Sequence, residues 1–358
     1  MMHRAEYVKA DGRKLWLYGC DPLSPIDCVP SPFATPLVSD THLRWNPVAG
    51  EWVIYATHRQ NRTFLPAPGT DPLAPTLDAD RQTELPQGNY DIAVFENRFP
   101  SLVLHPGSPP EMTDCKVAPA HGSCEVVVIT QDASRGLGQL TLDQACLLFE
   151  VWADRTRSMR DAGLAYVLPF ENRGVEMGAT LQHAHGQIYG YGFLPMQQAR
   201  MAQRFSEHHA RTGLDLIADL AAQERDRQIR LVAAAPEAVA FAPPFGRFPY
   251  ATWVAPMRAA PDLLALEASE RRDMAAVLQD TLRRLDALWQ RPMPYLMTVN
   301  QAPTGMREPG WTVHIQIWPI RRAADRLKFL AGTELGTGVF ANDVAPEVAA
   351  AALRSLSL

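Results

Sequence analysis

The segments AYVLPFENRG (165–174) and HAHGQIYGYGF (183–193) decide the fold, because together they predict two strands joined by a turn. Apolar and aromatic residues dominate both segments, and glycines lie between them. Alternate residues of a strand point to one face of its sheet. We therefore expect His183, His185 and Gln187 to line up on the same face of the second strand.

The order of elements around this strand pair occurs twice in the chain. The first copy has a strand at 124–130, a helix at 141–163 with Thr141 as its cap, and then the strand pair. The second copy repeats this order with a strand, an amphipathic helix and two strands, at 251–257, 269–290, 294–303 and 311–319. An internal duplication explains the repeat. It predicts an α+β fold of two related halves, each a mostly antiparallel sheet with a long helix, joined in one half-barrel-like sheet.

The rest of the chain divides around these two copies. Residues 20–41 and 65–88 are rich in proline and glycine, which favours an irregular arm and a long loop. Further strands are expected at 51–57 and 91–95, and a mostly helical connection at 197–235. The predicted organisation is an N-terminal arm, a half carrying the two histidines and a second half, at 1–40, 41–196 and 197–350.

Composition excludes several classes of protein. The chain has 358 residues and a formal net charge of −5, so it has no general positive field for nucleic acid. The polar N-terminus is not a signal peptide, and no apolar run is long enough to span a membrane. The five cysteines form no CxxC pair and no disulfide framework. These features predict a cytoplasmic protein with reduced thiols and no membrane partner.

The His–x–His pair has three interpretations. The two histidines could be hydrogen-bonded polar groups on a half-buried strand. They could chelate a metal, although no carboxylate nearby in the sequence completes such a site. Alternatively, one neutral imidazole could attack phosphorus while an acceptor on its other ring nitrogen fixes the tautomer. Gln187 would then bind the phosphoryl oxygens as their charge redistributes.

The segment FENRGVEMGATLQHAHGQIYGYGFLP (170–195) resembles the active-site segment of the galactose-1-phosphate uridylyltransferase family, a branch of the histidine-triad superfamily. Ala184 stands where the family usually has proline. Further similar blocks occur in the same order, at 43–64, 93–102, 311–319 and 328–347. The resemblance implies two duplicated histidine-triad-like halves, the second of them degenerate.

The resemblance also implies roles for individual residues. His185 matches the nucleophile that takes a uridylyl group from UDP-glucose, and Gln187 matches a phosphate-contacting glutamine. His183 would help to position His185. Substrate-binding positions are matched by Arg59, Arg62, Asn97, Asn172, Gly178, Thr180, Lys328 and Glu334. The last two correspond to positions that reach across from a partner subunit, which implies a homodimer.

Gln187 favours transfer over hydrolysis. Hydrolase branches of the superfamily carry a third histidine at this position, which protonates a poor leaving group. A phosphate monoester has a second pKa near 6 and can leave without a proton. We therefore expect exchange of a nucleotidyl group between a UDP-sugar and a sugar 1-phosphate. The alternatives are an enzyme for another sugar or base, a dinucleotide phosphorylase or hydrolase, and a binding protein that kept the scaffold.

The metal sites of the family are expected to be lost. Many members bind zinc through a CxxC pair and two histidines, but here Asp71, Ala74 and Ala133 stand at three of these positions. Some members carry iron in the second half, where Asn300 and Gln316 replace two histidines. We therefore predict no metal and no other cofactor.

Overall fold

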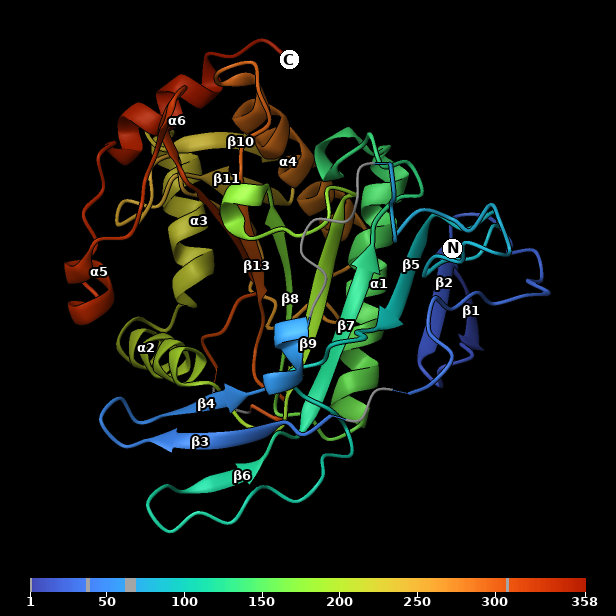
Figure 1. Cartoon of the computed structure of the whole chain (residues 1–358). Helices are drawn as coiled ribbons and strands as arrows, with labels where there is room; N and C mark the ends of the chain where they lie inside the picture. Colours follow the sequence, from blue (N-terminus) through green and yellow to red (C-terminus); the bar gives the residue numbers. More distant parts are fainter. Residues whose placement is uncertain (1, 37–38, 62–68, 307–308) are drawn as a thin grey trace.

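One large antiparallel sheet dominates the computed structural model, which describes residues 2–36, 39–61, 69–306 and 309–358 (Figure 1). Within these residues the sheet has eleven strands, and every neighbouring pair is antiparallel. In spatial order they are β1 (His3–Val8), β2 (Lys14–Gly19), β5 (Ile92–Glu96), β7 (Gly122–Val128), β9 (His185–Tyr191), β8 (Tyr166–Arg173), β13 (Tyr295–Asn300), β14 (His314–Pro319), β12 (Thr252–Pro256), β11 (Ala238–Phe241) and β10 (Leu231–Ala235).

The strand order is symmetric about the contact between β8 and β13. Moving outward, β9, β7 and β5 on one side correspond to β14, β12 and β11 on the other. The two long helices, α1 (Leu142–Asp161) and α4 (Ala268–Ala287), occupy equivalent places in the chain, each before a central strand. The α+β fold of two related halves is therefore confirmed, and the order of the strands shows how the halves join.

The helices α1 and α4 pack against each other and cover one face of the sheet. Helix α1 begins where the sequence predicts, because the Thr141 hydroxyl accepts from the Gln144 backbone N–H at 3.2 Å. The Gln144 side chain accepts from the Thr141 N–H in return, which completes a capping box. Apolar side chains of both helices meet the same-facing residues of the strands in one core, among them Val94 and Ile188. This face is closed to solvent.

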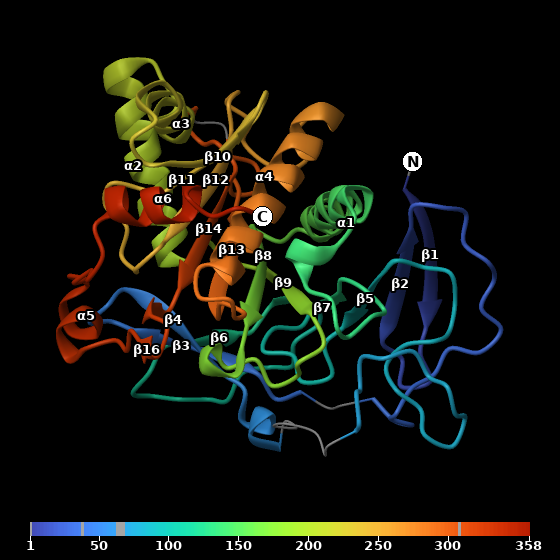
Figure 2. The same cartoon turned by 90° about the horizontal axis from the view of Figure 1, so that it is seen from above.

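The opposite face of the sheet is covered in three pieces (Figure 2). Helices α2 (Met196–Thr212) and α3 (Leu216–Arg227) pack over the second half through a separate apolar cluster. A loop that includes Leu73 and Leu85 packs over β2, β5 and β7. A small sheet of β4 (Glu51–Tyr55), β3 (His42–Asn46) and β6 (Val117–Pro119) packs near Tyr189 and Tyr191. The space between these pieces holds the candidate site.

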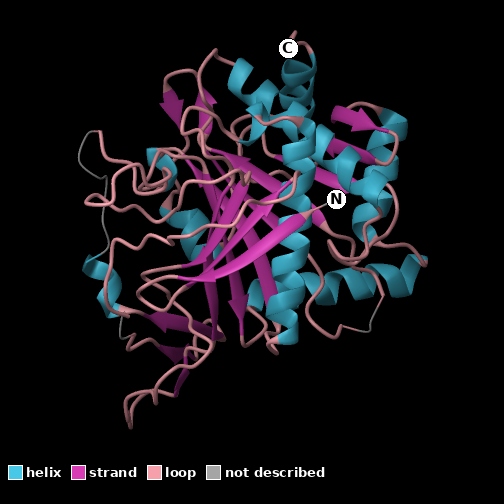
Figure 3. Cartoon of the chain, turned by 90° about the vertical axis from the view of Figure 1, so that its right-hand side faces the viewer, coloured by secondary structure: helices cyan, strands magenta, loops and turns pink. Residues whose placement is uncertain are grey.

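Shorter elements complete the described chain (Figure 3). They are the 3₁₀ helices η1 (Thr57–Asn61), η2 (Leu137–Gln139) and η3 (Val175–Met177), the ribbon of β15 (Arg321–Ala323) and β16 (Arg326–Leu327), and the helices α5 (Gly332–Thr337) and α6 (Pro346–Arg354). None of the helices in the described ranges is long and apolar enough to cross a bilayer.

The structure corrects two parts of the sequence analysis. The connection at 197–235 is helical only as far as Arg227, and its last residues form β10, which pairs with β11 at the edge of the sheet. The prediction of a mostly helical connection is confirmed, but its terminal strand was missed because a five-residue edge strand has too weak a local pattern. Residues 3–19 form the hairpin of β1 and β2, which the sequence analysis did not find. The domain boundaries at 40 and 196 stay a prediction.

Candidate active site

Strand β9 divides its side chains between the two faces of the sheet. Ile188 is fully buried under α1, and Gly186 and Gly190 leave room for neighbouring chain. A Cβ at Gly186 would meet the Phe170 carbonyl oxygen at 2.9 Å. His185 and Gln187 point to the other face, where both line the same pocket. The glycines keep β9 close to its neighbours, and the alternation presents the two polar side chains to that pocket.

His183 does not share this pocket. Strand β9 begins only at His185, and the His183 side chain turns into the interior, where 3% of the residue is exposed. The expectation that His183, His185 and Gln187 line one face is therefore correct for the last two and wrong for the first. The chain leaves the extended conformation before the strand, so strand periodicity does not apply to His183.

The tautomer of His185 follows from its backbone partner. Its Nδ1 lies 2.7 Å from the carbonyl oxygen of His183. A carbonyl oxygen only accepts, so Nδ1 carries the proton and donates. The lone pair of the neutral ring is then on Nε2. This is the arrangement that a nucleophilic imidazole requires.

His183 is clamped at both ring nitrogens. Nδ1 lies 2.7 Å from Asp71 Oδ2, and Nε2 lies 2.7 Å from the carbonyl oxygen of Thr130. Because both partners are acceptors, both nitrogens donate and the ring is an imidazolium. Burial alone lowers the pKa of His183, but the hydrogen bonds to Asp71 and Thr130 and the carboxylate charge together raise it. The clamp fixes the residue whose carbonyl orients His185.

The residues at the family zinc position do not fit a zinc ion. A histidine ligand must offer a lone pair, and both His183 nitrogens are donors instead. Ala74 and Ala133 supply no ligand atom. Across the described ranges, no group of three or more histidine, cysteine, aspartate or glutamate side chains is placed to hold a metal.

The residues at the second metal position expected from the family resemblance do not fit a metal ion either. His314 is fully buried, its Nδ1 donates to the Thr312 carbonyl at 2.9 Å, and its Nε2 accepts from Gln316 at 3.0 Å. Burial lowers the pKa of His314 to about 4, so the ring is neutral. Asn300 donates to the Thr298 hydroxyl at 3.0 Å. The Nδ1 of His314, like that of His185, donates to the carbonyl of the residue two positions earlier, but the His314 ring is fully buried.

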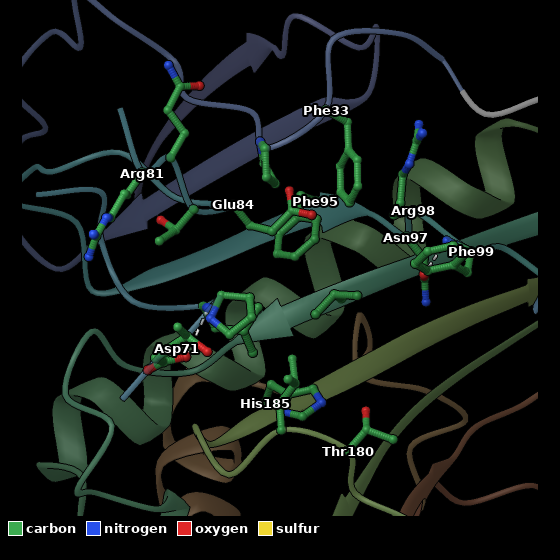
Figure 4. A pocket seen from close by; sticks show the side chains of 18 of the residues that line it. Phe33, Asp71, Arg81, Glu84, Phe95, Asn97, Arg98, Phe99, Thr180 and His185 are labelled. Carbon is green, nitrogen blue, oxygen red and sulfur yellow. Dashed lines mark hydrogen bonds between the residues drawn. The ribbon is translucent and has the colours of Figure 1, made fainter. Parts of the chain in front are cut away.

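The pocket beside His185 has a volume of about 580 Å³. Figure 4 shows His185 and Thr180 on one side and Phe33 and Phe95 on the other. Apolar side chains of Leu73, Phe95 and Val126 form its walls, and polar atoms come from Asn97, Arg98, Thr180 and Gln187. A cavity with apolar walls and a few convergent polar groups is the usual form of a small-molecule site.

Several predicted binding residues lie at or beside this pocket. Asn97 donates to Gln187 Oε1 at 3.4 Å and accepts from the Phe99 N–H at 2.8 Å. Arg59 on η1 donates to the Phe99 carbonyl at 2.5 Å, so it braces the segment that carries Asn97. Thr180 lines the pocket itself. Arg62 lies outside the described residues.

A second cavity of about 460 Å³ meets the first at His185. It is lined by Asn172, which donates to the Met177 carbonyl at 3.3 Å. Gly178 caps the turn after η3 with a φ of +74°, a conformation that favours glycine. Sequence reasoning missed the arginines of this cavity, which are Arg135, Arg173, Arg291 and Arg321. These arginines lie in different segments of the chain, so no sequence motif connects them.

Lys328 and Glu334 lie elsewhere. They form a buried pair with 2.7 Å between Nζ and Oε1, and Lys328 also donates to the Ala341 carbonyl. Neither residue is among those that line the two cavities beside His185. Within one chain, therefore, the fold does not bring them to His185.

Glu171 should make stability depend on pH. It is buried, accepts from the Tyr295 hydroxyl at 2.9 Å, and burial raises its pKa to about 7. Between the ordinary pKa near 4.5 and pH 7, the folded state keeps a proton that the unfolded state releases. Stability from this group is present below pH 4.5 and is lost as pH rises to 7, by at most about 3 kcal/mol.

Glu171→Gln tests this pH dependence, because the amide stays neutral and still accepts from Tyr295. Urea unfolding at pH 5, 6, 7 and 8 should show that the wild type loses stability relative to the variant as pH rises. Parallel curves for the two proteins would show that Glu171 does not titrate in this range.

The sequence of the chain matches two family descriptions that together span most of it. Residues 34–195 match "Galactose-1-phosphate uridyl transferase, N-terminal domain", and residues 199–358 match the C-terminal domain of the same family. The galactose-1-phosphate uridylyltransferase of Thermotoga maritima is 34% identical over 323 residues, which cover 87% of this chain and 97% of that protein. The Streptomyces lividans protein of the same name is 33% identical over 303 residues, covering 84% and 80%.

Solved structures give the same result. A structure described as a uridylyltransferase superposes with a TM-score of 0.79 at 29% identity, covering 88% of this chain and 97% of that one. An ADP-glucose phosphorylase from Arabidopsis thaliana superposes with a TM-score of 0.66 at 20% identity, covering 89% of this chain. The second likeness concerns the fold alone.

Proposed function

The chain belongs to the galactose-1-phosphate uridylyltransferase family, and from this membership we propose that it transfers a uridylyl group from a UDP-hexose to a hexose 1-phosphate through His185. The observation that carries the proposal is the His185 ring. Its Nδ1 is bonded to the His183 carbonyl, and the ring borders both cavities. An imidazole held in this way is suited to attack phosphorus with Nε2.

The reaction has two half-reactions at this atom. Nε2 of His185 attacks the α-phosphorus, the bond from phosphorus to the bridging oxygen breaks, and hexose 1-phosphate leaves with the electron pair. The Nδ1 hydrogen bond to the His183 carbonyl stabilises the positive charge that develops on the ring. An oxygen of a second hexose 1-phosphate then attacks the same phosphorus, and His185 leaves as the neutral imidazole.

Gln187 supports the phosphoryl group without moving a proton. Its amide lies beside Asn97, so two side-chain amides face the same side of β9 near His185. Amide N–H groups can stabilise the negative charge of the transition state but cannot protonate a leaving group. A phosphate monoester needs no such proton, whereas hydrolysis of poorer leaving groups does. This difference favours transfer over hydrolysis.

The test of the function is an exchange assay with the purified protein. UDP-glucose labelled at the α-phosphate should leave label on the protein, and galactose 1-phosphate should remove it as UDP-galactose. Other sugar 1-phosphates, phosphate and water are offered as acceptors in parallel. The resemblance places Thr333 where some members have a tyrosine near the sugar phosphate, and Phe340 near a glutamine that contacts the hexose, so this panel also identifies the sugar. Faster discharge by phosphate or water would favour the phosphorylase or hydrolase alternative.

No metal is assigned a step in this mechanism. The clamp of His183 between Asp71 and Thr130 would provide the rigidity for which relatives use zinc. In the second half, His314 bonds to Gln316 and to the Thr312 carbonyl, and Asn300 bonds to the Thr298 hydroxyl. We propose on these grounds that the enzyme works without zinc, iron or another cofactor.

A homodimer would bring Lys328 and Glu334 to the active site of a partner subunit. Exposed apolar side chains lie close to this pair in the sequence, with Phe329 78%, Leu335 74% and Val339 67% exposed. Large apolar groups gathered in this way mark interaction surfaces. The buried pair would stiffen the segment that presents them.

Phe329→Asp should shift the dimer toward monomer, because it places a charge in the proposed interface. Sedimentation should give the wild type about twice the chain mass of 39.7 kDa, and the variant a smaller mass with lower activity. Leu358→Asp is the control, since Leu358 is 58% exposed at the C-terminus, away from α5 in Figure 1. A fully active monomeric wild type would contradict the dimer.

A further inference from the structure

Residues 2–33, here called the N-terminal segment, lie outside both family matches, yet Pro32 and Phe33 line the pocket beside His185. Their hairpin continues the main sheet, because β2 pairs with β5 from Leu15 opposite Phe95 to Tyr18 opposite Ile92. Strand β5 leads directly into Asn97 and Arg98, which line the pocket. The N-terminal segment thus supports the strand that leads to these pocket residues.

The turn of this hairpin is a buried cluster of charges. Lys9, Asp11 and Arg13 are each at most 8% exposed. Arg13 donates to Asp11 Oδ2 at 2.7 Å and to Glu84 Oε2 at 2.8 Å, and Lys9 Nζ lies 2.6 Å from the same Glu84 oxygen. Glu84 belongs to the loop over the pocket and lines the pocket itself. Pairs this deeply buried fix geometry, because breaking one leaves a charge in the interior.

Arg98 is held by the same segment. Its guanidinium lies 4.3 Å from the ring centre of Phe33 and 3.7 Å from Asp11 Oδ2. It also donates to the Thr35 carbonyl at 2.9 Å. Its Nε is buried and has no hydrogen-bond partner within the described residues. The N-terminal segment therefore stacks on and orients an arginine that lines the pocket.

Phe33 is the residue of the N-terminal segment that lines the pocket with its ring. Its backbone N–H donates to the Ser31 hydroxyl at 3.3 Å, and the Ser31 N–H donates to the Gln82 side chain at 2.9 Å. The bond from Ser31 to Gln82 connects the N-terminal segment to the loop over the pocket. Figure 4 shows Phe33 near Phe95, on the side of the pocket away from His185.

We infer that Phe33 and the β1–β2 hairpin form part of the nucleotide site. The nucleobase stacks on the Phe33 ring. Arg98, which Phe33 and the hairpin position, donates a hydrogen bond to the base. The inference rests on the proposed function, which places the α-phosphorus at His185. A nucleotide anchored there extends its flat, apolar end toward Leu73, Phe95 and Phe33. An arginine donates to carbonyl oxygens, which uracil presents where adenine has an amino group. Arg98 should therefore contribute to the preference for a uracil nucleotide that the proposed function implies.

Phe33→Ala and Phe33→Tyr in the full chain test the stacking wall. Loss of a base–aromatic contact should raise the KM for UDP-glucose about ten-fold, while kcat and the KM for galactose 1-phosphate change less than about two-fold. Tyrosine should restore the KM, because it keeps the ring. Phe245→Ala is the matched control, since Phe245 is 57% exposed and packs edge-on against Trp253 in the second half. Arg98→Met should reduce the preference for UDP-glucose over ADP-glucose.

Binding of UDP and ADP by calorimetry separates the inference from the proposed function. Weaker UDP binding by Phe33→Ala supports the inference even if the wild type transfers no uridylyl group. An active wild type whose KM, UDP affinity and base preference are unchanged in both the Phe33→Ala and the Arg98→Met variants would overturn the inference alone. A wild type that binds no UDP would overturn both.

Discussion

Replacing His185 with alanine should lower the rate of uridylyl transfer by at least about 10⁴-fold, because the variant lacks the atom that forms the covalent intermediate. The carbonyl of His183 and the amide of Gln187 remain in place, but neither is a nucleophile at phosphorus. The variant should take up no label from UDP-glucose labelled at the α-phosphate. Its affinity for UDP should fall only slightly, since the wall residues of the pocket are untouched.

His105→Ala is the control for this experiment, because His105 is exposed and lies in a loop between β5 and β6. It should label and turn over like the wild type. A thermal unfolding curve identical to that of the wild type shows that His185→Ala is folded. Full activity of His185→Ala, or label that stays on the variant, would disprove the covalent mechanism.

Removing the carboxylate of Asp71 should reduce both stability and rate. In Asp71→Ala the buried His183 Nδ1 loses its partner, which should lower the free energy of unfolding by about 2 kcal/mol. The His183 carbonyl then loses part of its support, so His185 is less well oriented, and kcat should fall about ten- to a hundred-fold. Asp71→Asn should be milder, because its amide can donate to a neutral His183.

Metal removal separates this clamp from a zinc site. Exhaustive dialysis against EDTA should leave the unfolding temperature and activity of the wild type unchanged, and metal analysis should find no stoichiometric zinc. Asp78→Ala is the matched control for Asp71→Ala, since Asp78 is an exposed aspartate of the same loop. Stoichiometric zinc whose removal destabilises the wild type would show that His183 is a ligand and that the clamp is wrong.

Much of the fold was predictable because it depends on local patterns. The helices α1 and α4 have clear apolar periodicity and start signals, and their order with the strand pairs revealed the duplication. His185 and Gln187 were predicted to lie together because residues two positions apart on a strand point to the same face of the sheet. The short edge strand β10 and the hairpin of β1 and β2 were missed. Their stability depends on pairing with a neighbouring strand more than on their own residues.

The sequence by itself determined the family, the α+β architecture and the residue proposed as nucleophile, since these follow from motifs and periodicities within a few dozen residues. Only the tertiary structure placed Asp71 against His183, 112 residues away, and the hairpin turn against Glu84 and Arg98. It also separated Lys328 and Glu334 from the cavities of their own chain. The physical reason is that a contact between distant segments depends on the path of the chain through the fold, which local periodicity does not encode.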